Sequence, residues 1–224
     1  MSLEKGLEYV YIKLRWGYEI MKLGKRNKLL FGVGINDTDY NVYEYENVDS
    51  KHKIVWQCPF YRTWMSMLAR CYSEKFQSRQ PTYKGCSVCE EWLTFSTFKK
   101  WMEQQDWENK QLDKDLLKEG NKIYSPEYCI FVDRKINTFV IDSGASRGEY
   151  LIGVCLYMQK DGIKFQSHCS NPFTRKLEYL GLFTNELDAH LVWKKRKHEL
   201  ACQLAESELV SDPRLAEVLK TRYI

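Results

Sequence analysis

The sequence predicts an α+β protein, and three features of the chain lead to this fold class. Apolar residues at helical spacing follow Pro59, a residue type favoured in the first turn of a helix. Segments later in the chain have the patterning of strands. A long helix then begins at Thr184 and continues to about Ala205. The three predicted strands cover residues 149–158, 164–168 and 177–183.

Composition excludes several classes of protein. The chain has 224 residues, enough for one large domain or two small ones, and its 44% apolar content excludes wholesale disorder. No apolar stretch approaches the roughly 18 residues of a membrane span, and the scattered charges of the first 30 residues lead us to expect no signal peptide there. We therefore expect a cytoplasmic protein whose eight cysteines are buried thiols or metal ligands. The net charge of +4 does not by itself predict a nucleic-acid partner.

The first half of the chain contains two predicted helices after an ambiguous start. Residues 7–23 fit a helix as well as a strand, and residues 31–37 are typical of a short strand or loop. The second helix is expected after Thr94 or Ser96. The first helix, which begins at Pro59, is expected to place Tyr61, Trp64, Met65, Leu68 and Cys71 on its apolar face.

The second half contains short elements and then the predicted three-stranded sheet. A strand near Leu112, an irregular polar loop, a second strand at 129–132 and a short helix at 134–137 are expected in that order. A final helix begins at Asp212-Pro213. The polar stretch 142–148 is the best candidate for a domain boundary. The long helix is expected to have an apolar stripe of Leu187, Ala189, Leu191 or Val192, Leu200 and Leu204.

Four motifs occur in a fixed order in the central part of the chain. They are YRTWMSMLARCY at 61–72, YKGCSVCEEWLTF at 83–95, LDKD at 112–115 and GNKIYSPEYCIF at 120–131. This order resembles a group of phage-encoded proteins related to HNH homing endonucleases. The resemblance implies a ββα-metal finger, in which a two-stranded hairpin and a helix surround one divalent cation. It also implies a phage protein that acts on DNA in the bacterial cytoplasm.

The resemblance places the candidate catalytic residues at Asp113, Lys114, Asp115 and Asn137. Asp113 and Asp115 would bind Mg²⁺ or Mn²⁺ through oxygen, Asn137 would complete the site, and Lys114 would contact phosphate. The chain departs from the family because Lys114 stands where an HNH protein has histidine, and no histidine lies between His52 and His168. An alternative interpretation is that both aspartates cap a turn and face solvent.

Five of the eight cysteines lie between residues 58 and 129. Cys86 and Cys89 have the CxxC spacing that lets two thiolates bind one Zn²⁺. With Cys71 and Cys129, which belong to the matched motifs, they form one hypothesis: a structural zinc ion. The alternative is that all four are packed core thiols.

The last quarter of the chain resembles an AP2-type DNA-binding domain. The residues that carry the resemblance are RGEYLIGV at 147–154, KFQSH at 164–168, LGLF at 180–183 and TNELDAHLVW at 184–193. The resemblance implies three antiparallel strands laid in the major groove of double-stranded DNA, with a helix packed behind them. Alternation predicts that Val154, Phe165 and Leu180 face this helix. The predicted DNA-binding residues are Tyr157, Lys164, Gln166, His168, Arg175, Lys176 and Tyr179, with Cys155 on the same outward face.

Together these features predict four segments and a leading function. The segments are an N-terminal part at 1–55, an HNH-like module at 56–143, an AP2-like domain at 147–206 and a C-terminal helix at 207–224. The leading hypothesis is a metal-dependent DNA endonuclease. Two alternatives stay open, namely a DNA-binding protein without catalysis and a phage protein that binds a host protein. The basic run Lys194-Lys195-Arg196-Lys197 is either a solvated helix face or a phosphate contact.

Overall fold

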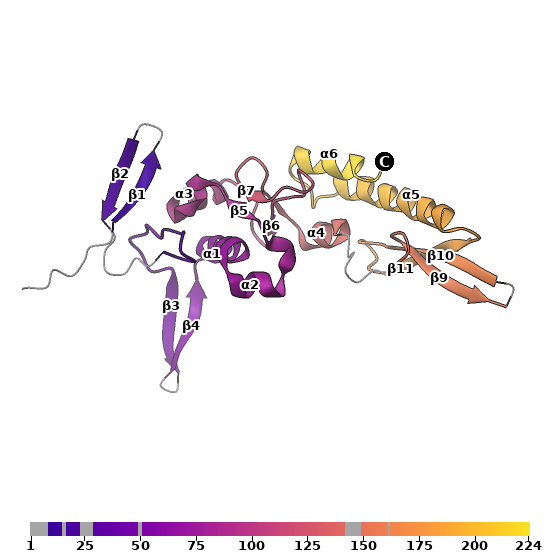
Figure 1. The fold of residues 1–224 in the computed structure, drawn as a ribbon, viewed down its shortest axis with the longest axis horizontal. Helices are drawn as coiled ribbons and strands as arrows, with labels where there is room; N and C mark the ends of the chain where they lie inside the picture. Colours follow the sequence, from indigo (N-terminus) through magenta and orange to yellow (C-terminus); the bar gives the residue numbers. More distant parts are fainter. Residues whose placement is uncertain (1–8, 15–16, 23–28, 49–50, 142–148, 161) are drawn as a thin grey trace, which may run out of the picture. The chain divides into compact units, whose positions relative to one another are not determined.

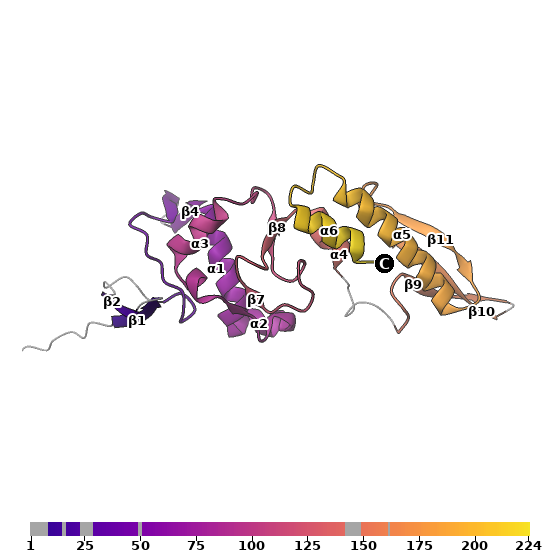
Figure 2. The ribbon, with the colours of Figure 1, turned by 90° about the horizontal axis from the view of Figure 1, so that it is seen from above.

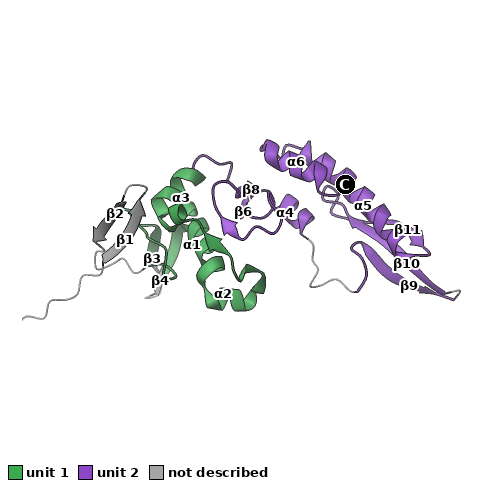
Figure 3. Ribbon diagram, turned by 45° about the horizontal axis from the view of Figure 1, so that its top comes forward, with its two compact units in different colours: residues 1–102 green, residues 103–224 purple. Residues whose placement is uncertain are grey.

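The computed structural model describes residues 9–14, 17–22, 29–48, 51–141, 149–160 and 162–224. The fold is mixed α+β with small sheets, one of which is a three-stranded antiparallel sheet, as the sequence predicts. The chain divides into two compact units, Met1–Met102 and Glu103–Ile224 (Figure 3). None of the helices in the described part of the chain is long and apolar enough to cross a membrane.

Unit 1 consists of two β-hairpins followed by short helices. The ambiguous start of the chain therefore forms strands, since β1 pairs with β2 and β3 pairs with β4, both antiparallel. Its elements are β1 (Tyr9–Leu14), β2 (Gly17–Lys22), β3 (Tyr43–Val48), β4 (Lys51–Gln57), α1 (Pro59–Tyr72), α2 (Glu74–Arg79), η1 (Pro81–Tyr83), β5 (Ser87–Val88), η2 (Glu90–Leu93) and α3 (Phe95–Met102) (Figure 1).

Helix α1 is the centre of the unit 1 core. The predicted helix start at Pro59 is confirmed, and the apolar spacing buries one side of the helix. Trp64 is fully buried, and its indole N–H donates to the carbonyl of Trp92 at 2.7 Å, which satisfies the one polar group of this side chain. Met67 rather than the predicted Met65 is the buried methionine of this face.

Unit 2 consists of a small two-stranded sheet with a helix, then the three-stranded sheet with two helices. Strand β6 pairs antiparallel with β8, and the second sheet has the order β11-β10-β9. In Figures 1 and 2, α5 lies along one face of this second sheet and α6 lies beside α5. The elements are β6 (Gln111–Asp113), β7 (Ile123–Tyr124), β8 (Ile130–Val132), α4 (Arg134–Val140), β9 (Val154–Gln159), β10 (Gly162–Ser170), β11 (Leu177–Phe183), α5 (Glu186–Ala205) and α6 (Pro213–Thr221).

One apolar core joins the elements of unit 2. It contains side chains from β8, α4, β10, α5 and α6, with Leu200 and Leu204 of α5 completely buried. Gly153 packs against Trp193 so closely that a Cβ atom at Gly153 would lie 2.1 Å from the indole ring. Its φ of +82° is a second reason for glycine at this position. The contact fixes the start of the sheet against the middle of α5.

Two expectations about this region are wrong, and a third is right only in part. The first strand of the sheet begins at Val154 rather than residue 149, because residues 151–153 form a turn whose carbonyl at Ile152 contacts His190 of α5. Asn185 rather than Thr184 caps α5, since its side chain accepts the Asp188 N–H. The predicted apolar stripe is only partly right: Ala189, Leu200 and Leu204 are buried, whereas Leu187 and Leu191 are exposed and Trp193 takes the place next to the sheet.

Candidate nucleic-acid interface

The outer face of the β9–β11 sheet brings together five of the residues predicted to bind DNA. Tyr157 of β9 lies opposite Lys164 of β10, and His168 of β10 lies opposite Tyr179 of β11. Gln166 lies between these two pairs along β10. Because directly opposed residues and residues two apart on one strand share a face, these five side chains lie on the same side of the sheet.

Burial shows that this side is the one turned away from α5. Val154, Ser167 and Cys169 occupy the alternate positions, and all three are buried at 8% exposure or less. Cys169 belongs to the core cluster that includes the buried side chains of α5. The five side chains of the outer face therefore point away from the helix. The strand register places the five residues on one face, as the alternation in the sequence predicted, and burial identifies it as the outer face.

The outer face is aromatic and polar, with one cation. Tyr157 is 41% exposed and Tyr179 is 58% exposed. The rings of Tyr179 and His168 are in contact, with centroids 5.5 Å apart. Nδ1 of His168 is buried and has no hydrogen-bond partner among the described residues. The face thus carries hydroxyl, amide, imidazole and ammonium groups, which can form hydrogen bonds with a polar ligand.

The loop between β10 and β11 holds the other two predicted DNA-binding residues. Arg175 and Lys176 are both exposed there. Asn171 begins this loop and is itself only 7% exposed. Its side-chain oxygen accepts the N–H of Phe173 at 2.8 Å and that of Thr174 at 3.1 Å. The loop is therefore tied together at its base by one buried amide side chain.

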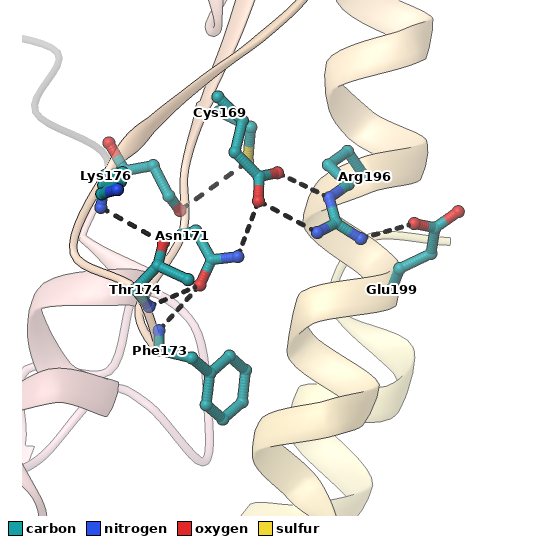
Figure 4. A network of polar contacts seen from close by, with 9 residues as sticks. Cys169, Asn171, Phe173, Thr174, Lys176, Arg196 and Glu199 are labelled. Atoms are coloured by element: carbon teal, nitrogen blue, oxygen red, sulfur yellow. Dashed lines mark hydrogen bonds and ion pairs between the residues drawn. The ribbon is translucent and has the colours of Figure 1, made fainter.

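An ion pair connects this loop to α5. Asn171 donates its amide N–H to Glu178 at 2.7 Å, and Glu178 accepts two hydrogen bonds from the guanidinium of Arg196, at 2.7 and 3.1 Å (Figure 4). These bonds, from Arg196 first and Asn171 second, lower the pKa of Glu178 to about 2. The carboxylate thus stays ionised at any physiological pH, and the connection persists with it.

The basic run on α5 is divided between internal contacts and solvent. Arg196 is bonded to Glu178 and Glu199. Lys197 donates to the carbonyl of Phe139 at 2.6 Å and lies over its ring, and burial lowers the pKa of this lysine to about 8. Only Lys194 and Lys195 remain as cations of this run without such internal bonds in the described structure. The structure therefore favours an internal role for half of the run.

The LDKD segment lies at the end of β6, in the same unit. Oδ1 of Asp113 accepts the backbone N–H groups of Asp115 and Leu116 at 2.9 and 2.7 Å. Burial, and secondly the charge of Asp115, raises the pKa of Asp113. Asp115 is half exposed. The turn-capping role that the sequence left open for these aspartates is thus present for Asp113, while Asp115 remains accessible.

Lys114 points into the protein rather than toward solvent. Its ammonium binds Oδ2 of Asp115 at 2.9 Å and the carbonyl of Asn121 at 3.0 Å, and the residue is 6% exposed. Asn121 returns two hydrogen bonds, to the carbonyls of Lys114 and Ile123. Asn137 of α4 donates to the side chain of Gln111 at 2.8 Å. The four predicted catalytic residues thus lie at the end of β6, in the loop after it and in α4, but the ammonium of Lys114 is bonded within the loop.

The predicted zinc ligands are placed in both units. Cys71, Cys86 and Cys89 belong to unit 1, and Cys129 belongs to unit 2. Cys71, Cys86 and Cys129 are buried. Burial raises the pKa of the half-buried Cys89, which favours the thiol over the thiolate that zinc binds. Within the described ranges, no group of three or more His, Cys, Asp and Glu side chains is arranged to hold a metal ion. The zinc ion stays a prediction.

Sequence reasoning missed the residues that hold the β10–β11 loop. Asn171, Glu178 and Arg196 were not predicted to act together, because they lie in a loop, on a strand and on a helix, up to 25 residues apart. The available signal was the Asn-Pro pair at 171–172, since asparagine before proline is typical of turn initiation. Nothing local in the sequence indicates that Arg196 is the residue that meets Glu178.

Comparison with known proteins adds no relative. No protein-family model matches the chain, and no curated protein or solved structure is significantly similar to it. The interpretation of the site therefore depends on the geometry described above and on the motifs of the sequence.

Proposed function

We propose that this protein binds double-stranded DNA through the outer face of the β9–β11 sheet. The observation that carries the proposal is the strand register, which gathers Tyr157, Lys164, Gln166, His168 and Tyr179 on the face opposite α5. The AP2-type resemblance of the same segment implies strands that lie in the major groove. Donors and acceptors on such a face can pair with base edges, where each base pair presents a distinct pattern.

The composition of the face limits the expected mode of binding. It contains no arginine, and Arg paired with guanine is the commonest specific contact between proteins and DNA. Tyrosine, glutamine and histidine supply shorter hydrogen-bonding groups, with Lys164, Arg175 and Lys176 as cations at the face and at the adjoining loop. We therefore expect moderate affinity with a salt dependence that reflects a few phosphate contacts.

The test is a titration of fluorescently labelled duplex DNA of random sequence at several salt concentrations. Lys164→Ala is expected to weaken binding about tenfold and to reduce the salt slope by about one. Lys220→Ala is the matched control, because it removes the same charge from α6, where Lys220 is 46% exposed and its partner is only a distant surface glutamate. Loss of affinity in both variants to the same extent, or no binding by the natural protein at low salt, would refute the proposal.

A second candidate function is the DNA endonuclease implied by the HNH-like motifs. The observation that favours it is the pair formed by Asp113, the last residue of β6, and Asp115, two residues later. Strand β6 pairs with β8, and α4 follows β8. Mg²⁺ is commonly held by one or two carboxylates together with substrate phosphates, so this pair fits such an ion. The ion would stabilise charge on the leaving oxygen. Within the LDKD segment, the Lys114 side chain is buried, whereas the Asp115 side chain is half exposed and so can be reached by an ion from solvent.

Asp113→Asn tests this second function better than Asp113→Ala. The asparagine oxygen can still accept the N–H groups of Asp115 and Leu116, so the loop is retained while the charge is lost. We expect nicking of supercoiled plasmid in Mg²⁺ or Mn²⁺ by the natural protein and none by this variant. Asp133→Asn is the control, because asparagine also caps a helix well at this N-cap position. Equal cleavage by all three proteins, or by none, removes the catalytic assignment and leaves DNA binding.

A further inference from the structure

Hydrogen bonds within residues 171–176 close the loop between β10 and β11. The N–H of Asn171 donates to the carbonyl of Lys176 and the N–H of Arg175 donates to the carbonyl of Asn171, both at 2.9 Å. Two further N–H groups, of Phe173 and Thr174, donate to the side chain of Asn171. The N–H of Lys176 donates to the hydroxyl of Thr174 at 3.4 Å. Five of the six residues therefore have their backbone N–H groups fixed within the loop, and the sixth is a proline, which restricts the loop's conformations.

The loop is also bonded to α5 through side chains. The amide nitrogen of Asn171 binds Glu178, which binds Arg196 through two hydrogen bonds, and Arg196 binds Glu199 at 2.9 Å (Figure 4). Arg196 belongs to α5, whose C-terminal half lies in the core of unit 2. Since two carboxylates already neutralise this guanidinium, Arg196 is a poor candidate for a phosphate contact of its own. Its position indicates that it supports the loop.

Arg175 has a backbone conformation that is unfavourable for arginine. Its φ is +59°, in the left-handed region that glycine or asparagine normally occupies. A residue with a Cβ atom is strained in that region and persists there only where the surroundings hold it. The side chain is exposed and lies next to the exposed Lys176. Phe173, 47% exposed, adds an aromatic ring to the same loop.

We infer that Asn171, Glu178 and Arg196 are positioning residues that hold Arg175 and Lys176 ready to contact DNA phosphates beside the groove. The inference rests on the proposed DNA-binding function and extends it to residues that do not touch the DNA. A loop that is already ordered loses little conformational entropy on binding, so its two cations contribute more to affinity than the same cations on a flexible loop. The chemistry recognised is the phosphate backbone, and the loop adds no base specificity.

The test compares Asn171→Ala with the double variant Arg175→Ala/Lys176→Ala in the same salt titration. The double variant is expected to make the salt slope shallower by about two, one for each lost cation. Asn171→Ala keeps both cations, yet it is expected to weaken binding about threefold to tenfold and to make the slope shallower by about one. Adding Asn171→Ala to the double variant is expected to have no further effect, because the cations that it positions are already absent.

Asn185→Ala is the matched control for a merely structural role. Asn185 also uses its side chain to accept a backbone N–H, at the start of α5, so its loss lowers stability without opening the loop. The DNA affinity and salt slope of Asn185→Ala are expected to equal those of the natural protein. Glu178→Gln is the second variant in case Asn171→Ala does not fold; it removes the ionic contact with Arg196 and is expected to weaken binding about twofold to threefold, with a shallower salt slope.

The outcomes separate this inference from the proposed function. If Lys164→Ala weakens binding while Asn171→Ala and Glu178→Gln bind as the natural protein does, the sheet binds DNA and the positioning role is wrong. Additive effects of Asn171→Ala and the double variant would also overturn the positioning role. If the natural protein binds no DNA at low salt, both the function and the inference fail.

Discussion

The outer face of the β9–β11 sheet and the LDKD loop differ in what their polar side chains are used for. On the sheet, Tyr157 and Tyr179 are exposed, and the contacts with the core that includes α5 are made on the opposite face. In the loop, the side chains of Asp113 and Lys114 form hydrogen bonds with backbone groups of the loop itself. Similar polarity in the sequence thus leads to an exposed polar face in one place and largely to a turn held by its own hydrogen bonds in the other.

The two regions also differ in what shapes them. The sheet takes its form from the core behind it, where Gly153 meets Trp193 and Cys169 joins the α5 side chains. The loop takes its form from a few polar bonds centred on Lys114 and Asn121. Substitutions behind the sheet should therefore change both stability and DNA affinity, whereas substitutions in the loop should change stability and leave DNA affinity nearly unchanged.

Gly153→Ala is expected to have the largest effect. The added Cβ would lie 2.1 Å from the Trp193 ring, and alanine is strained at a φ of +82°. We expect a loss of about 3 kcal/mol in the free energy of unfolding, measured by urea titration, together with weaker DNA binding. The surface substitution Lys160→Ala, in the β9–β10 turn, should leave the free energy of unfolding nearly unchanged. Full stability of Gly153→Ala would mean that the sheet is not held against α5 in this way.

Lys114→Met is expected to have an intermediate effect. Methionine keeps much of the side-chain volume but leaves the carbonyl of Asn121 and the carboxylate of Asp115 without their ammonium partner. We expect a loss of about 2 kcal/mol in the free energy of unfolding, with DNA affinity within about twofold of that of the natural protein. A large fall in DNA affinity, beyond that of Lys220→Ala, would instead support the phosphate contact that the sequence predicted for Lys114.

Asp113→Asn is expected to have the smallest effect, and one that depends on pH. The pKa of Asp113 is raised in the folded protein, by burial first and by the charge of Asp115 second, so the folded state holds this proton more tightly than the unfolded chain. The contribution to stability is present below the ordinary pKa and is lost as pH rises through the raised value. At neutral pH the variant should therefore be slightly more stable than the natural protein.

The pH series provides the check on that prediction. Thermal unfolding of both proteins between about pH 4 and pH 7 should show the advantage of Asp113→Asn growing as the pH rises. A stability difference that stays constant over this range would mean that the environment of Asp113 does not disfavour its charged form.

Much of the local structure was predictable, because helical spacing and strand alternation reflect which side is buried. The start of α1 at Pro59 and the start of α6 at Asp212-Pro213 follow from proline and cap preferences. The start of β9 was not predictable, since it depends on the contact of Ile152 with His190, a residue 38 positions away. Residues 7–23 could not be assigned because their apolar pattern satisfies both periods.

The candidate site was predictable only in part, for a similar reason. Alternation alone places Lys164 and Gln166 on one face, and the register then adds Tyr157 and Tyr179. The direction of the Lys114 side chain could not be inferred, because a lysine between two aspartates looks solvated in sequence. Its burial depends on Asn121, seven residues later, which supplies a carbonyl at the right distance.

Mapping of backbone amide chemical shifts during titration with duplex DNA tests the central claim most directly. If the sheet binds DNA, the perturbed amides should gather along β9, β10 and β11 and in the 171–176 loop, with little change in α6 or around Asp113. Perturbations confined to α5 and α6, or an absence of perturbations at low salt, would contradict DNA binding by the sheet.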